Sequence, residues 1–369
     1  MLKVEIDLTK LRKNIDHLKK LSGNKKLLPV VKANAYGHGA TGVALFLEQE
    51  GYRKLAVYDF EEALELWEGG VRTQILLFCP CTEEQLDICQ ERNFIPTIYD
   101  EESLKFYAKK AANRNHKMPF ALHFSTGMNF LGLQPEIYLS LLSSSLEEPG
   151  LILTDVYSHL SDGEAEDGIY SRAQFQYFKH LTVGISKIAN THLLNTAGIL
   201  NLGTLPIDTI RPGAGIYGYC LGDKDHPFQP VMRVSGTLCA VRKLKKGQTI
   251  GYNRTYKVKK DSYYGVFSVG YARGLTTGGF QGLDVLIAGM RHPIVGKVSM
   301  DKVAIYLADE LNGNFDLEQE VVLLGQQKDE RIDAEEIGNK TSRIFYEVLC
   351  HLCPTSKRIY KKSENDLKV

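Results

Sequence analysis

The stretch LLPVVKANAYGHG, residues 27–39, carries the strongest structural signal in the chain. A short apolar run ends at Lys32, and small, polar and glycine residues follow, a pattern typical of a buried strand that enters a turn. A lysine is seldom buried at a strand end without a function, and one held against apolar walls can form a Schiff base. A surface lysine at an exposed strand end is the alternative interpretation.

Further apolar runs follow up to residue 210, and amphipathic helical stretches separate them. Eight strands that alternate with helices over about 200 residues indicate a (β/α)8 TIM barrel, in which the carboxyl ends of the strands carry the active site. A doubly wound open sheet is the alternative, because periodicity does not distinguish an open sheet from a closed one. The predicted strands are residues 27–31, 54–57, 74–78, 94–98, 120–124, 151–157, 192–194 and 209–210.

The pattern changes after about residue 225, where strand-like runs between glycine-bearing turns replace the helical periods. The sequence therefore predicts an α/β barrel domain over residues 8–225 and a mostly β domain over residues 226–369. The opening segment MLKVEID, residues 1–7, is predicted to be a strand that pairs with the second domain. A short helix is predicted near residues 333–352.

The composition excludes several classes of protein. With 43% hydrophobic and 24% charged residues, the 369-residue chain is neither a disordered polyelectrolyte nor collagen-like. Its 45 basic and 44 acidic residues give a net charge of +1, which favours a small-molecule partner over nucleic acid or a membrane surface. The chain has neither a signal-like opening nor an apolar run of about 18 residues, so we expect a cytoplasmic protein. The seven cysteines are irregularly spaced, and the CxxC of Cys350 and Cys353 has no second pair, so we expect no metal site.

Residues 32–39, KANAYGHG, resemble the lysine motif with which alanine racemases hold pyridoxal phosphate. The resemblance spans roughly residues 1–350 and implies fold type III of the pyridoxal enzymes, whose barrel agrees with the eight predicted strands. Seven further segments resemble that family's motifs in the family's order: LAVYDFEEALELWEGG (55–70), FSTGMNFLG (124–132), YSHL (157–160), NTAG (195–198), IRPGAGIYG (210–218), VGYARG (269–274) and GKVSMD (296–301).

The resemblance implies two acid/base residues, Lys32 and Tyr271. Lys32 would hold pyridoxal phosphate as a Schiff base and, once released, exchange a proton with the substrate α-carbon. Racemisation requires proton removal on one face and delivery on the other, so Tyr271 would act on the second face. In the family this tyrosine comes from the partner subunit, which implies a head-to-tail homodimer with shared active sites. A phenol with a pKa near ~10 serves as a base only beside a cation.

The resemblance also implies a cofactor site. His159 would hydrogen-bond to Arg211, and Arg211 would face the pyridine nitrogen. Because an arginine does not surrender its proton, the ring nitrogen would stay unprotonated, which weakens the electron sink and favours racemisation over transamination. Met300 would contact the substrate carboxylate through its backbone amide. The residues expected around the phosphate are Tyr36, Asn195, Thr196, Gly213 and Ala214.

The chain departs from the family's pattern at several positions. Phe130 occupies the substrate-binding position where the family has an arginine that binds the carboxylate and acidifies the tyrosine. His123 takes the place of a carbamylated lysine that positions this arginine in some members. Pro354 aligns with a phosphate-contacting tyrosine, for which Tyr360 is a candidate substitute. Arg273 replaces an acid and offers a positive charge near the tyrosine base or the carboxylate.

These observations predict a pyridoxal-phosphate-dependent alanine racemase, an isomerase that supplies D-alanine for peptidoglycan. A racemase of another amino acid, such as serine or one with a longer side chain, is an alternative, because a changed carboxylate pocket could accompany a changed substrate. A racemase-like protein that binds pyridoxal phosphate or an amino acid with weak turnover is a further alternative, although Lys32 and Tyr271 argue against it. Arg211 argues against a fold type III decarboxylase, which would offer an acid to the ring nitrogen.

Overall fold

The computed structural model describes residues 2–112, 117–222, 226–276, 282–307 and 317–362. The chain divides into two compact units. The α/β unit is Leu11–Gln229, and the β unit is Met1–Lys10 together with Pro230–Val369. Among the described helices, none combines the length and the apolar character that crossing a bilayer requires.

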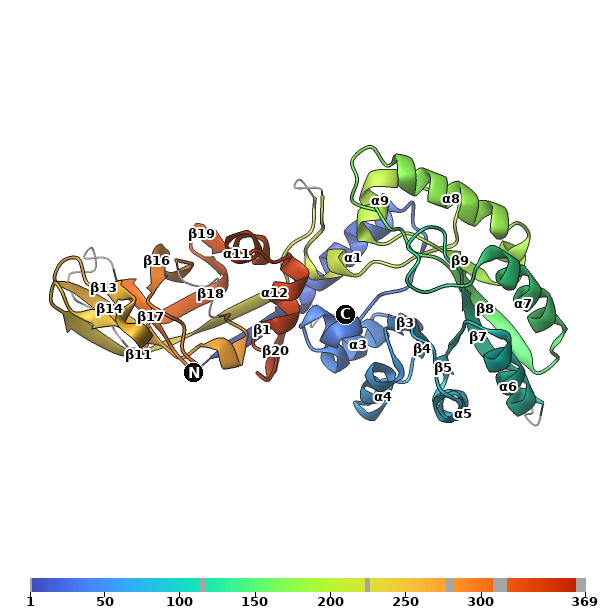
Figure 1. Cartoon of the computed structure of the whole chain (residues 1–369), viewed down its shortest axis with the longest axis horizontal. Helices are drawn as coiled ribbons and strands as arrows, with labels where there is room; N and C mark the ends of the chain where they lie inside the picture. The colour runs from blue at the N-terminus through green and yellow to red at the C-terminus, as the bar shows by residue number, and fades with distance from the viewer. Residues whose placement is uncertain (1, 113–116, 223–225, 277–281, 308–316, 363–369) are drawn as a thin grey trace. The chain divides into compact units, whose positions relative to one another are not determined.

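Parallel strands form the centre of the α/β unit (Figure 1). One sheet has the order β3-β4-β5, and a second has the order β2-β10-β9-β8-β7-β6. All of the strand pairings in these two sheets are parallel. The strands are β2 (Lys26–Leu27), β3 (Lys54–Val57), β4 (Gln74–Leu77), β5 (Phe94–Ile95), β6 (Thr97–Ile98), β7 (Met118–His123), β8 (Leu151–Tyr157), β9 (Asn190–His192) and β10 (Thr209–Ile210).

The two parallel sheets join into one closed barrel. At one junction Val30, which follows β2, forms a parallel bridge to Ala56 of β3. At the other junction β5 and β6 are two halves of one strand position, interrupted at Pro96, which has no N–H to donate to a neighbouring strand. The segment 94–98 is therefore not the continuous strand that the sequence predicts. The ring has eight strand positions, so the TIM barrel is confirmed and the open sheet is excluded.

The helices of this unit lie outside the strands, and several of them begin at a capping side chain (Figure 1). Asp59 and Asp100 each accept the N–H of the residue three positions further on, and Thr82 forms a reciprocal capping box with Gln85. These polar starts separate each helix from the strand before it. The helices up to residue 217 are α1 (Leu8–Leu21), α2 (Lys32–Tyr36), α3 (Ala40–Gln49), α4 (Phe60–Glu68), α5 (Glu83–Arg92), α6 (Glu101–Ala111), α7 (Pro135–Glu147), α8 (Ile169–Leu181), α9 (Thr196–Leu202) and α10 (Ala214–Tyr217), with a 3-10 turn η1 (Ile185–Lys187).

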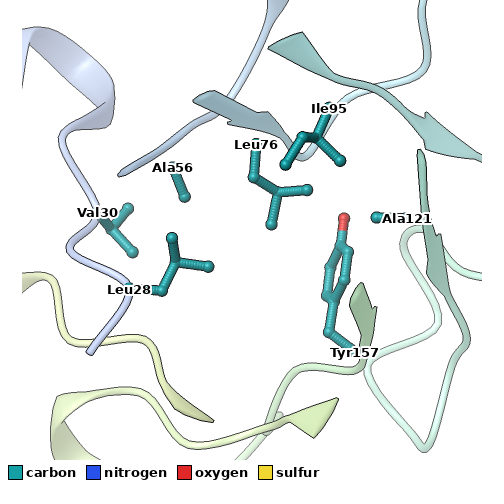
Figure 2. Packing of buried hydrophobic residues seen from close by; sticks show 7 residues of the cluster. All are labelled: Leu28, Val30, Ala56, Leu76, Ile95, Ala121 and Tyr157. Atoms are coloured by element: carbon teal, nitrogen blue, oxygen red, sulfur yellow. The ribbon is translucent and has the colours of Figure 1, made fainter. Parts of the chain in front are cut away.

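Buried side chains fill the interior of this barrel (Figure 2). Ala56 and Ala121 are small, which leaves space for the Tyr157 ring, and the Tyr157 hydroxyl lies 3.0 Å from Thr97 Oγ1. Because the barrel axis is packed, a ligand must bind at the mouth of the barrel rather than inside it. The cluster consists of Leu28, Val30, Ala56, Leu76, Ile95, Ala121 and Tyr157.

The β unit contains a second, antiparallel barrel. Its sheet has the order β19-β18-β15-β16-β17-β14-β11-β1-β20, and a further pairing between β18 and β11 closes a ring of six strands. Two register shifts allow the 13-residue strand β11 to pair in turn with β18 and with β14. The strands are β1 (Lys3–Asp7), β11 (Met232–Leu244), β12 (Thr249–Ile250), β13 (Tyr256–Lys257), β14 (Ser262–Phe267), β15 (Asp284–Ile287), β16 (Met290–Val295), β17 (Val303–Leu307), β18 (Glu320–Gln327), β19 (Glu330–Ile332) and β20 (Arg358–Lys361).

Both ends of the chain join this β unit. Strand β1 pairs antiparallel with β11 and parallel with β20, so the opening residues lie within the sheet of the β unit. The helical segment near the end differs from the single helix that the sequence predicts, because it forms two helices, α11 (Ala334–Thr341) and α12 (Phe345–His351). Ser342 ends α11 in the left-handed region with a φ of 55°, and the Arg343 N–H then bonds to the Gly338 carbonyl.

Candidate active site

Lys32 lies at the mouth of the α/β barrel, just after β2, the first strand of that barrel, and its bridging residue Val30. The four residues after it form a left-handed turn, with φ angles from 51° to 54° over residues 33–36. None of the four is glycine, and each L-residue in this conformation costs roughly 1–2 kcal/mol. The turn therefore stores several kcal/mol of backbone strain directly beside Lys32, and the surrounding structure must hold it.

Polar side chains hold the far end of this turn. Asn34 Oδ1 accepts the N–H of Ala40 at 2.7 Å. The His38 ring is buried, and its Nδ1 lies 3.0 Å from the Ala35 carbonyl oxygen and 2.9 Å from the Tyr36 carbonyl oxygen. The same ring stacks on the Tyr217 ring at a centroid distance of 4.6 Å. The two side chains thereby bond to backbone groups at the end of the turn and at the start of α3.

Glu62, in the first turn of α4, holds the near end of the same turn. Its Oε1 accepts the Ala33 N–H at 2.5 Å, and its Oε2 accepts the Tyr58 N–H at 2.7 Å. Burial raises the pKa of Glu62, while the two backbone amides and the charge of Lys32 oppose this rise. Sequence reasoning did not identify Glu62. The available signal was its position three residues after the capping Asp59, where a glutamate side chain reaches back past the start of the helix.

Three segments expected around a phosphate come together at the barrel mouth. A Cβ on Gly213 would overlap the Tyr36 hydroxyl, and one on Gly215 would lie 2.7 Å from Thr196 Cγ2. The Gly215 N–H also donates to Thr196 Oγ1 at 3.1 Å. These glycines leave a cradle lined by small groups and two hydroxyls, which suits a phosphate dianion. Ala214, the first residue of α10, is buried beside them.

Asn195 lies at the same strand end but has a local role in the structure. Its Oδ1 accepts the Gly198 N–H at 2.9 Å, so the side chain caps α9. This cap positions Thr196 at the start of the helix. A contact between Asn195 and a cofactor stays a prediction.

Arg211 follows β10 and is buried in the barrel mouth. Its Nη2 donates to the carbonyl oxygens of Ser158 and, at 3.3 Å, Leu193, and its guanidinium carbon lies 5.2 Å from the centroid of the Tyr157 ring and 5.5 Å from that of Phe78. Among the described residues, Nε has no hydrogen-bond partner and no carboxylate pairs with the guanidinium. Burial lowers the pKa of Arg211 to about 10, so it stays cationic at neutral pH. An uncharged aromatic nitrogen would satisfy this orphaned donor, so the site fits a pyridine ring.

His159 follows β8 and lies close enough to Arg211 to sense its charge. Burial, and then the positive charges of Arg211 and Lys32, lower the pKa of His159 to about 3, so its ring is neutral. The hydrogen bond that the sequence predicts between His159 and Arg211 is not among those of the described residues. The guanidinium bonds instead to main-chain carbonyls, including that of Ser158 next to His159.

A column of three stacked rings lies beside Arg211, with Tyr157 in the middle. The His123 and Tyr157 rings are 4.6 Å apart, the Tyr157 and His192 rings are 5.1 Å apart, and both pairs are parallel to within 6°. His192 Nε2 lies 3.4 Å from Asp155, which also pairs with Lys54 at 2.6 Å. Burial lowers the pKa of His123 to about 3 and that of His192 to about 4. Both histidines are therefore neutral, and the ion pair lies at the far end of the column.

Tyr271 and Met300 lie together on the β unit. Tyr271 begins a 3-10 turn, η3 (Tyr271–Arg273), and its N–H donates to the Ser299 carbonyl at 3.0 Å, while the Ala272 N–H donates to the Met300 carbonyl at 3.0 Å. Gly270 permits this approach, because a Cβ there would overlap the same two carbonyls. Tyr271 is 44% exposed and Met300 is 53% exposed, so the β unit itself does not bury either side chain.

Family comparisons agree with this arrangement. A profile of the alanine racemase N-terminal domain matches residues 6–220, and one of the C-terminal domain matches residues 231–360. The chain belongs to the alanine racemase family.

Relatives match this alanine racemase family member over nearly its whole length. The alanine racemase of Clostridium novyi (strain NT) is 30% identical over 376 residues, which cover 99% of this chain and 96% of the relative. An alanine racemase structure from Clostridium difficile 630 has a TM-score of 0.91 at 26% identity and covers 98% of this chain and 96% of that one. The Bartonella henselae structure, with a TM-score of 0.86, 26% identity and coverage of 98% and 99%, contains covalently bound pyridoxal phosphate. The histidine racemase of Leuconostoc mesenteroides, at 22% identity and a TM-score of 0.88 with 98% of both chains covered, shows the same fold.

Phe130 marks the first departure from the alanine racemase pattern. The loop that carries it is anchored through Thr126, whose Oγ1 lies 2.9 Å from Ser158 Oγ and accepts the Gln174 side-chain N–H at 3.0 Å. Phe130 itself is 87% exposed. The loop therefore presents an exposed apolar ring at the position where the resemblance implies a cation.

Two further departures from the alanine racemase pattern lie together in the β unit. Arg273 Nη1 donates to Thr355 Oγ1 at 3.3 Å and to Ser356 Oγ at 3.0 Å, in the loop that begins with Pro354. Pro354 is exposed, and Tyr360 lies in β20 opposite residue 6 of β1. The Arg273 side chain thus contacts the loop that begins with Pro354. Whether Tyr360 replaces the family's phosphate contact stays a prediction.

Proposed function

We propose that this protein is a pyridoxal-phosphate-dependent racemase that interconverts L- and D-alanine. The observation that carries the proposal is the set of groups at one barrel mouth: the amine of Lys32, the orphaned donor of Arg211 and the glycine cradle beside Tyr36 and Thr196. Full-length relatives that are alanine racemases support the same activity. Supply of D-alanine to peptidoglycan is the proposed biological role, and the cytoplasmic location stays a prediction.

Each part of pyridoxal phosphate has a proposed partner in the chain. Lys32 would bind the aldehyde carbon covalently, Arg211 would donate to the ring nitrogen, and the neutral His159 lies beside that arginine. The remaining groups would hold the phosphate: Tyr36, Asn195, Thr196, Gly213 and Ala214. When bound, this cofactor withdraws electrons from the substrate α-carbon and thereby acidifies its proton.

The chain's own groups would then move one proton between two faces of the α-carbon. The Lys32 amine would take or return the proton on one face, and the Tyr271 phenol would act on the other. Arg211 donates a hydrogen bond without giving up its proton, because its pKa of about 10 keeps it charged. Electron withdrawal is therefore moderate, which favours return of the proton to the same carbon.

We propose a head-to-tail homodimer in which Tyr271 and Met300 complete the site of the partner subunit. The support is that both side chains are about half exposed on their own unit although the main chain holds them rigidly together. The Met300 amide would contact the substrate carboxylate. Mixing Lys32→Ala protein with Tyr271→Phe protein tests this arrangement, because a mixed dimer has one intact pair of bases. Absence of any regained activity after proven subunit exchange would exclude shared sites.

A racemase of another amino acid is the second candidate. The exposed ring of Phe130 favours it, because no cation occupies that position to fix a small carboxylate substrate. The test of both candidates is α-proton exchange, followed by NMR in D2O, with pyridoxal phosphate and single L-amino acids. Fast exchange with racemised alanine supports the first candidate, and preference for another amino acid supports the second. Bound cofactor without exchange of any substrate would contradict both.

A further inference from the structure

Glu62 is a half-buried carboxylate near the proposed base, and it lies in the segment 55–70, to which the sequence assigns no catalytic or binding residue. We propose that Glu62 is a positioning residue for Lys32: its carboxylate fixes the peptide that follows the lysine and places a negative charge beside the lysine amine. This inference rests on the proposed function, because it concerns the same site.

The geometry of the carboxylate supports the first half of this inference. Its two oxygens each accept one backbone N–H, at 2.5 Å from Ala33 and 2.7 Å from Tyr58. These amides follow two neighbouring barrel strands, which are themselves joined by the bridge between Val30 and Ala56. Glu62 thus ties the two strand ends together at the barrel mouth.

The hydrogen bond from the Ala33 N–H to Glu62 is the one that bears on the position of Lys32. This N–H belongs to the peptide bond whose carbonyl is that of Lys32, so fixing this amide fixes the backbone rotation that directs the lysine side chain. The left-handed turn that starts at Ala33 is strained and persists only where its surroundings hold it. Among the described residues, Glu62 is the acceptor for the Ala33 N–H, whereas Asn34 and His38 hold the other end.

The charge environment supports the second half. The causes that set the pKa of Glu62 are, in order, burial, the amides of Tyr58 and Ala33, the like charge of Asp59 and the opposite charge of Lys32. Lys32 is therefore close enough for its charge to be sensed at the carboxylate. An ammonium group near a carboxylate retains its proton more firmly, and removal of that carboxylate makes the amine easier to deprotonate.

The test compares Glu62→Gln with Glu65→Gln, which changes an exposed glutamate one turn further along α4. The full-length chain, freed of pyridoxal phosphate, is acetylated with acetic anhydride across a pH series, and mass spectrometry follows the Lys32 peptide. We expect the midpoint of Lys32 acetylation to move to lower pH in Glu62→Gln and to stay at the wild-type value in Glu65→Gln. An unchanged midpoint in Glu62→Gln would overturn the electrostatic half.

Steady-state kinetics of the holoenzyme test the positioning half. A small misplacement of a catalytic group costs up to ~100-fold in rate, so we expect kcat to fall about 10- to 100-fold in Glu62→Gln with KM changed much less. Glu62→Asp keeps the charge but is too short to reach both amides, so its Lys32 midpoint should stay near the wild-type value while kcat still falls. Wild-type kcat in both variants would overturn the positioning role. The acetylation result does not depend on racemase activity, so failure of the proposed function and failure of this inference are distinguishable.

Discussion

Gly213→Ala is the sharpest perturbation of the proposed phosphate cradle. A Cβ at this position would overlap the Tyr36 hydroxyl and lie 2.8 Å from Tyr36 Cζ and 3.3 Å from Cε2. Extra atoms in a packed site cost about 1–3 kcal/mol. If the Tyr36 ring moves to relieve the overlap, its hydroxyl leaves the cradle.

This displacement should weaken binding of pyridoxal phosphate. A loss of about 1–3 kcal/mol corresponds to roughly a 5- to 150-fold increase in Kd. The assay is a titration of cofactor-free protein with pyridoxal phosphate, followed by absorbance, together with a thermal melt. Tyr36→Phe removes the nearest atom but leaves Cζ in place, so the double variant Gly213→Ala with Tyr36→Phe should lose less affinity than the sum of the two single variants.

An unchanged Kd and Tm in Gly213→Ala would refute the reasoning, because the hydroxyl could not then lie against this glycine. Strict additivity in the double variant would also refute it, since two groups in direct contact must be coupled. Tyr36→Phe alone serves as the control for the loss of the hydroxyl itself.

Three further changes follow from the structure. The pKa values of about 3 for His123 and His159 and about 4 for His192 mean that the unfolded chain binds three protons that the folded chain does not bind. The free energy of unfolding should therefore fall by roughly 4 kcal/mol per pH unit between pH ~6 and pH ~4, measured by urea unfolding at several pH values. Burial alone would raise the pKa of Asp155, but His192 and Lys54 hold it well below its usual range. Asp155→Asn should therefore lower the free energy of unfolding by about 3 kcal/mol, measured with urea at pH 7. A loss below about 1 kcal/mol would contradict the buried pair. In the wild type, the Asp155 carboxylate contributes to the free energy of unfolding above pH ~4, and this contribution is lost as the pH falls through its lowered pKa. Phe130→Arg should lower the KM for alanine by about 10- to 100-fold, because a charge-assisted contact to the carboxylate contributes about 1.5–3 kcal/mol. An unchanged KM would show that this position does not face the substrate.

The sequence predicts the barrel well because each strand is a separate apolar run. The predicted strand positions agree with the eight positions of the ring, and their order needs no long-range information, since each strand pairs with the next along the chain. Errors occur where one residue interrupts a pattern. Pro96 divides one strand position, and Ser342 separates two helices, although the apolar periodicity continues across both positions.

The left-handed turn after Lys32 could not be predicted from the sequence pattern. The run of four residues with positive φ contains no glycine, so no residue preference signals it. One of the contacts that hold it is distant in sequence, because Glu62 comes from α4, whereas His38 follows the turn directly. Short-range rules cannot predict a turn that tertiary contacts impose against local preference.

The contacts among side chains at the site follow from closure of the barrel rather than from motifs. His123, Tyr157 and His192 come from three strands, and their stacking requires the register between those strands. The motifs placed Arg211 at the site, but its bonds to main-chain carbonyls and its orphaned Nε emerge only in three dimensions.

The pairing of β1 has a consequence for the order in which the parts of this protein fold during synthesis. Val4 pairs with Val234 and with Arg358, so the first strand must wait until more than two hundred later residues have emerged. The strands of the α/β unit are all available before then, and that unit can close while the chain is still growing. Closing a flexible loop costs entropy that increases with its length, and prior folding of the intervening segment removes most of that cost. The α/β unit thereby acts as a folded spacer that brings the first strand within reach of its late partners.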